Sequence, residues 1–207
     1  MIHQGALAGH RVIDVSSLPD QGEFGHKGLI WWGTTGYMVI EGSMLVMALI
    51  TYFYLRLKVD EWPPGQPNPD LFYGTLNFAI LLASAVPNHL AKAAGEKFDL
   101  GRTRFWLVIC VLFGIALLYV RWFEFIGVNC RWDDNAYGSM VWCLLVLHTI
   151  QLATDVVETG VLSALMFAGP INKKRYIDVS ENGLYWYFIV AWWIPIYLTI
   201  YFAPRWL

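Results

Sequence analysis

The stretch FWLVICVLFGIALLYVRWFEF, residues 105–125, decides the fold class, because it is apolar over about the 20 residues that a helix needs to cross a lipid bilayer. Four more stretches of this kind occur at 30–55, 71–91, 137–167 and 184–203. Their apolar residues do not alternate with polar ones, as they would in a strand of a membrane barrel. The sequence therefore predicts an all-α fold, a polytopic bundle of about five transmembrane helices.

The composition supports a membrane protein. Of the 207 residues, 57% are hydrophobic and 14% are charged, whereas a soluble domain carries roughly a quarter charged residues. The net charge of −2, without a cluster of excess basic residues, argues against nucleic acid as a partner. The scattered Cys110, Cys130 and Cys143 show no paired spacing, so we expect free thiols.

The chain divides into a polar segment and a membrane domain. Residues 1–28 lack the apolar core of a cleaved signal peptide, and we interpret them as a cytoplasmic N-terminal segment ahead of a five-helix domain at 29–207. With the N-terminus inside, nine of the 14 Lys and Arg residues fall on the cytoplasmic side, namely Arg11, Lys27, Lys92, Lys97, Arg102, Arg104, Lys173, Lys174 and Arg175. This excess predicts a cytoplasmic N-terminus and a periplasmic C-terminus in the inner (cytoplasmic) membrane.

Two polar residues, Glu41 and His148, interrupt the apolar stretches at one depth. Each lies about 11 residues into its helix, on helices that enter from opposite faces, so both reach about 16 Å, near the bilayer midplane. An isolated charge there costs about 3 kcal/mol or more. We therefore expect a buried polar pair, joined directly or through one water or side chain, that fixes helix packing. A proton-carrying role for Glu41 is the alternative.

A second group of titratable residues falls on or near the expected cytoplasmic side. His3, His10 and His26 lie in the polar segment, and imidazoles titrate close to neutral pH. Asp155 and Glu158 are three residues apart, so they share a face near the inner end of the fourth helix. These five residues either form a proton-uptake surface or simply reach the aqueous interface.

Metal-ligating residues are scarce in the apolar stretches. Only His89 and His148 lie there, and their depths differ by roughly 10 Å, whereas a haem with two histidine ligands needs both at one depth. The sequence also lacks nucleotide-binding loops and the zinc-binding helix motif. We expect no catalytic residue, no metal site and no cofactor site in this chain.

Several short motifs follow one another from about residue 29 to the C-terminus. They are WWG at 31–33, VIEG at 39–42, TYFYLR at 51–56, EWPP at 61–64, LN at 76–77, LLAS at 81–84, Glu124, YGS at 137–139, His148, YW at 185–186 and IY at 200–201. In this order and spacing they resemble the haem-copper oxidase (cytochrome c oxidase) subunit III family. In that family, Glu41 would be the mid-membrane glutamate.

The resemblance implies an accessory membrane subunit of a proton-pumping terminal oxidase of the aerobic respiratory chain. Such a subunit stabilises the catalytic subunit I, which holds the haem and copper, and supports proton uptake, while carrying out no redox chemistry itself. A subunit III-like component of a quinol oxidase or nitric oxide reductase is an alternative, since the electron donor is not encoded here. A small proton-coupled transporter, with Glu41 as its proton-binding site, is another.

The chain departs from the family pattern at some positions. Gln151 stands where the family often has a second histidine, and Tyr187 and Val190 replace a histidine and an aspartate of the last helix. Five helices resemble the short form of the family, which lacks the first two helices of the long form. The family's phospholipid cleft would then be incomplete or completed by a neighbouring subunit, with bound phospholipid and membrane lipids as expected partners.

Overall fold

The computed structural model of the chain describes residues 22–206 and is built from long helices. A short 3-10 helix, η1 (Gly25–Lys27), is followed by α1 (Leu29–Arg56), α2 (Leu71–Glu96), α3 (Leu100–Gly127), α4 (Ala136–Ala168), α5 (Lys173–Tyr197), a π-helical turn η2 (Leu198–Phe202) and α6 (Ala203–Trp206). Five helical segments are long and apolar enough to cross a membrane, and residues 22–206 contain no strand. The predicted all-α membrane fold is confirmed, and the chain is an integral membrane protein.

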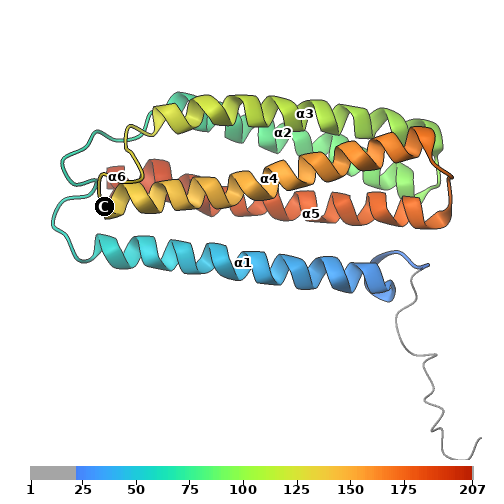
Figure 1. Cartoon of the computed structure of the whole chain (residues 1–207), viewed down its shortest axis with the longest axis horizontal. Helices are drawn as coiled ribbons and strands as arrows, with labels where there is room; N and C mark the ends of the chain where they lie inside the picture. Colours follow the sequence, from blue (N-terminus) through green and yellow to red (C-terminus); the bar gives the residue numbers. More distant parts are fainter. Residues whose placement is uncertain (1–21, 207) are drawn as a thin grey trace, which may run out of the picture.

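The long helices run side by side along one axis (Figure 1). α2 and α3 lie together on one side of the bundle, α4 and α5 occupy the middle, and α1 lies on the opposite side, where it packs against α4 and α5. We call the end at which α1 and α5 begin the proximal end, and the end at which α2 and α4 begin the distal end. These two ends define where each polar site lies.

Side chains that cap the helix starts explain the boundaries. The carboxylates of Asp70 and Asp99 accept hydrogen bonds from the first turns of α2 and α3, and the amide oxygens of Asn135 and Asn172 do the same for α4 and α5. Each cap satisfies a backbone N–H that has no partner inside its helix. α4 ends at Ala168 and Gly169 follows, where the sequence predicted the end of this helix.

α5 begins 11 residues before the apolar stretch 184–203 that predicted it, at Lys173. Its first turns are polar, and they include Ser180, Glu181 and Asn182, which are buried against neighbouring helices. A search for apolar stretches misses such turns, because their side chains are polar and are buried against protein and not against lipid. The early start of α5 adds acidic and amide groups to the interior of the proximal half.

An aromatic cluster fixes the distal end. Tyr52 of α1, Trp62 of the loop between α1 and α2, and Tyr137 of α4 are each no more than 6% exposed. The ring centroid of Trp62 lies 5.3 Å from that of Tyr52 and 5.1 Å from that of Tyr137, both in edge-to-face geometry. This loop is therefore folded into the bundle and ties α1 to α4.

The C-terminal turn approaches α2 closely. The Tyr201 ring lies against Gly74, where a Cβ atom would overlap it. Arg205 donates hydrogen bonds to the carbonyl oxygens of Tyr201 and Pro69, the latter at 2.6 Å. Together these contacts hold η2 and α6 against the start of α2.

Candidate functional site

A buried ion pair lies in the distal half of the bundle. Arg121 and Glu124 are one turn apart on α3, with 3.1 Å between Nη1 and Oε2. The Glu124 carboxylate also accepts hydrogen bonds from Asn77 Nδ2 of α2 and from the Tyr201 hydroxyl of η2, each at 2.7 Å. Glu124 therefore joins three elements and has a donor at each carboxylate oxygen.

Arg121 extends this network to α4 and α5. Its Nη2 atom lies 3.2 Å from His148 Nδ1, and His148 Nε2 lies 3.0 Å from the Ile189 carbonyl oxygen. A carbonyl oxygen only accepts, so Nε2 carries the proton and Nδ1 accepts from Arg121, which makes the imidazole neutral. The Arg121 guanidinium also lies over the Trp193 ring, 3.9 Å from its centroid.

This ion-pair network of Asn77, Arg121, Glu124, His148 and Tyr201 is closed to solvent. Each of these residues is at most 2% exposed. Residues 22–206 contain no group of three or more His, Cys, Asp or Glu side chains that could hold a metal ion. The arrangement can hold four helices in register, because removing any one partner leaves a buried polar group unsatisfied.

Glu41 lies elsewhere. Its Oε2 atom accepts a hydrogen bond from the Tyr185 hydroxyl of α5, and the Tyr185 ring packs against Tyr37, with the ring centroids 5.6 Å apart. His148 instead contacts Arg121 and the backbone of Ile189, as described above. The expected Glu41–His148 pair is thus replaced by two separate contacts. Equal depth in the membrane does not determine the side of its helix on which a residue lies. Glu41 and His148 lie on sides that face different neighbours, and each forms its hydrogen bonds there.

Asp155 and Glu158 have different surroundings although they share one helix. Asp155 is 1% exposed and accepts a hydrogen bond from Asn182 Nδ2 at 3.1 Å. The Thr159 hydroxyl lies within hydrogen-bonding distance of both of these side chains. Glu158 is exposed. Asp155 therefore contributes to packing between α4 and α5, whereas Glu158 is accessible.

The three histidines expected beside these carboxylates are only partly described. His26 is exposed in η1, at the proximal end. His3 and His10 lie outside the described residues. His26 and Glu158 are thus the accessible members of the expected group within residues 22–206.

An acidic pocket opens in the proximal half between α1, α4 and α5. Its volume is about 330 Å³, and the side chains that line it include Thr34, Tyr37, Glu158, Asp178, Glu181 and Tyr185. Asn182, the partner of Asp155, also lines it. Three acidic residues from two helices therefore line one cavity, and Tyr185 connects its wall to Glu41.

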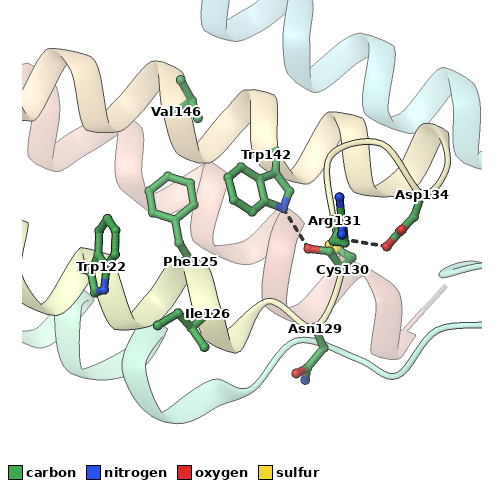
Figure 2. A pocket seen from close by; sticks show the side chains of 9 residues that line it. All are labelled: Trp122, Phe125, Ile126, Asn129, Cys130, Arg131, Asp134, Trp142 and Val146. Atoms are coloured by element: carbon green, nitrogen blue, oxygen red, sulfur yellow. Dashed lines mark hydrogen bonds between the residues drawn. The ribbon is translucent and has the colours of Figure 1, made fainter.

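A larger, apolar pocket of about 700 Å³ lies at the distal end, on α3 and α4 (Figure 2). Its walls are mostly Trp122, Phe125, Ile126, Trp142 and Val146, and the loop from Asn129 to Asp134 closes one end. Trp142 Nε1 donates to the Cys130 carbonyl oxygen at 2.8 Å. Burial raises the pKa of the Cys130 thiol to about 11, so this cysteine stays a protonated thiol at neutral pH.

Sequence reasoning missed the acidic pocket because two of its three carboxylates, Asp178 and Glu181, precede the apolar stretch 184–203. One signal in the sequence could have revealed it: the polar segment before this stretch has side chains spaced three to four residues apart, as in a helix. Asp178 and Glu181 are three apart, which places both on one face of a helix that continues upstream.

No protein-family model matches the chain. Curated relatives named cytochrome c oxidase subunit 3 do match most of it. The one from Synechocystis is 24% identical over 184 residues, covering 87% of this chain and 78% of the relative. The one from Thermostichus vulcanus is 23% identical, covering 84% and 87%, and the one from Drosophila yakuba is 25% identical, covering 82% and 68%. This likeness supports the subunit III family and a subunit III-like component of an oxidase.

Proposed function

We propose that this chain, whose curated relatives are named cytochrome c oxidase subunit 3, is an accessory, non-redox subunit that stabilises the catalytic subunit I of a proton-pumping terminal oxidase and supports proton uptake. The observation that carries the proposal is the likeness to these relatives over more than 80% of the chain. The closed ion-pair network agrees with a structural role. The haem and copper belong to the partner subunit in this proposal.

The outer face of α1 supports a role within a larger membrane assembly. Val39, Ile40 and Met47 are each more than 60% exposed, although α1 is packed against α4 and α5 on its other side. Such a face is stable only against lipid or against another apolar surface. We propose that subunit I or membrane lipid covers the exposed apolar faces of the bundle.

The proximal end is the proposed cytoplasmic side, as the excess of basic residues there predicts. Lys97, Arg102, Lys173 and Lys174 lie at or near this end in the structure. Protons would then be collected by exposed groups such as His26 and Glu158, on the side from which an oxidase takes them up.

The apolar pocket is the proposed site of a bound phospholipid chain. Val146 lies 10 residues into α4 from Ala136, about 15 Å, which is half the thickness of the hydrocarbon core. The polar loop residues Asn129, Arg131 and Asp134 close the pocket at its distal end, at the level of lipid head groups. One acyl chain running parallel to α3 and α4 fits these dimensions.

The test is co-purification. The full chain carries an affinity tag and is isolated in mild detergent from membranes of its own cells, and the visible spectrum of the eluate is recorded. We expect haem bands from a co-purifying partner, and none when the chain is produced alone in a heterologous host. An eluate without a haem-bearing partner favours the transporter alternative, and stoichiometric haem in the isolated chain contradicts an accessory subunit. A co-purifying partner with the haem types of a quinol oxidase or nitric oxide reductase selects that alternative.

A further inference from the structure

We propose that Asp155 of α4 is a proton-binding site inside the bundle, where its carboxyl group is a neutral acid at neutral pH and donates its proton to Thr159. Three side chains, Asp155, Thr159 and Asn182, form a hydrogen-bonded ring that joins α4 to α5. Proton binding at this ring is independent of the proposed oxidase function, which is tested separately by co-purification.

The ring needs three protons for its three contacts. Asn182 Nδ2 lies 3.1 Å from Asp155 Oδ1, and Thr159 Oγ1 lies 3.1 Å from Asn182 Oδ1 and 3.4 Å from Asp155 Oδ2. The amide group places one N–H in the ring, and the hydroxyl group has one O–H. The third proton has to come from Asp155, and this count stays the same if the oxygen and nitrogen of the amide are exchanged. With an ionised Asp155, two acceptors would face each other at one of the three contacts.

The ring is buried and has no positive charge of its own. Asp155 is 1% exposed, Thr159 3% and Asn182 6%. Asp155 takes part in none of the ion pairs within residues 22–206. It lies three residues from the centre of the 33-residue α4, about 5 Å along the helix axis, at the level of the hydrocarbon core. An ionised carboxylate is costly there, and a neutral acid avoids that cost.

The titratable side chains around Asp155 also favour the neutral acid. Within residues 22–206 those that face it are Glu158 on α4, Cys110 on α3 and Tyr185 on α5. Tyr185 is in turn hydrogen-bonded to Glu41 of α1. All of these groups are neutral or negatively charged, so none of them supplies a positive charge that could take the place of the proton.

Proton binding at Asp155 links folding to pH. An aspartate side chain in water releases its proton above about pH 4. The folded chain would therefore hold one proton at neutral pH that the unfolded chain has released, and its stability would fall as pH rises. Asn182, the most exposed member of the ring, lines the pocket between α1, α4 and α5, which gives protons access from the proximal end.

The test uses the full chain in detergent and the variant Asp155→Asn. The asparagine amide has about the size of the neutral acid and offers both an acceptor for Asn182 and a donor for Thr159, so the variant is expected to fold. Infrared difference spectra between the wild-type chain and the variant at neutral pH distinguish a carboxylic acid from a carboxylate by their stretching bands. Glu61→Gln, exposed in the distal loop, is the matched control for an acid in water.

We expect Asp155→Asn to remove a carboxylic-acid band that shifts on transfer to D₂O, whereas Glu61→Gln removes a carboxylate band. Thr159→Val deletes the acceptor of the Asp155 proton and is expected to shift the same carboxylic-acid band. This second variant tests the ring even where Asp155→Asn does not fold. The proposal is overturned if Asp155→Asn removes a carboxylate band, or if Thr159→Val leaves the carboxylic-acid band unchanged.

Unfolding across a pH series gives a second readout. Near neutral pH, the folding equilibrium constant of the wild-type chain is expected to fall about tenfold more per pH unit than that of Asp155→Asn, because folding of the wild-type chain binds one proton more. The other titratable groups are common to both chains, so the difference isolates Asp155. Equal pH dependence of the two chains contradicts a proton held at Asp155.

Discussion

Arg121 and Glu124 form an ion pair that water does not reach, with side chains 2% and 0% exposed. Burying two charges carries a desolvation penalty of several kcal/mol per ion, and mutual attraction offsets it only when further hydrogen bonds complete the geometry. Asn77 and Tyr201 supply such bonds to Glu124, and His148 accepts one from Arg121, whose Nε atom has no hydrogen-bond partner within residues 22–206. The pair is thus one part of a five-residue unit whose members depend on each other.

We expect Arg121→Met or Glu124→Leu alone to destabilise the subunit by about 3–5 kcal/mol, because each leaves the opposite charge buried without its partner. The double variant is expected to lose less than either single one, since no charge is then left. Thermal unfolding of the full chain in detergent measures all three. Additive losses in the double variant would mean that the two charges are not coupled.

Gly74→Ala is expected to destabilise the C-terminal turn by about 1–3 kcal/mol, because the added methyl group overlaps the Tyr201 ring and displaces its hydroxyl from Glu124. Gly36→Ala is the matched control, since a Cβ there meets nothing within 4 Å. That control is expected to be neutral or slightly stabilising, because alanine favours a helix over glycine. Equal unfolding temperatures for the two variants would contradict the close approach of η2 to α2.

Glu41→Gln is expected to preserve assembly, because the amide oxygen still accepts from the Tyr185 hydroxyl. Glu41→Ala removes that acceptor and is expected to cost about 1–3 kcal/mol. Tyr185→Phe removes the hydrogen-bond donor and so tests the same contact from its other partner. The readouts are the yield of assembled complex and its turnover. Lost activity in Glu41→Gln with assembly intact would instead assign Glu41 a proton-carrying role.

Reporter proteins fused to the chain can determine its orientation in the membrane. A reporter fused after Leu207 is expected to act as extracytoplasmic, and one in the turn around Phe98 as cytoplasmic, because the proximal end carries the excess of basic residues. The reverse pattern would place the acidic pocket on the opposite side of the membrane from the one proposed.

Removal of the subunit from the assembled oxidase is expected to slow turnover progressively as pH rises and to leave the haem spectra nearly unchanged. Bulk protons become scarcer at high pH, so a surface that collects them, such as His26 and Glu158, matters most there. Steady-state oxygen consumption across a pH series measures the effect. A loss of equal size at every pH would indicate a scaffold alone.

The five membrane helices were predictable because lipid demands continuous apolar runs, and each run appears directly in the sequence. The local Arg121–Glu124 pair can also be predicted from the sequence, since residues three apart are neighbours on one face of a helix. The partners that lie far apart in the sequence could not be predicted. Which residue faces Glu41 depends on the rotation of each helix about its axis, and the sequence shows Tyr185 only as part of the YW motif at 185–186. Its hydrogen bond to Glu41 became visible only in three dimensions.

The position of α1 has a consequence for biogenesis. Of the five long helices, α1 is synthesised before the others, whereas the helices against which it packs, α4 and α5, are synthesised after α2 and α3. The chain has 79 residues between α1 and α4 and 116 between α1 and α5, so α1 resides in the bilayer without these helices while the intervening residues are synthesised. The hydrogen bond between Glu41 and Tyr185 forms only after α5 has been made. The closing of α1 onto the bundle is therefore a late event, and a product truncated before α4 would insert α1 but leave it without either of the helices against which it packs.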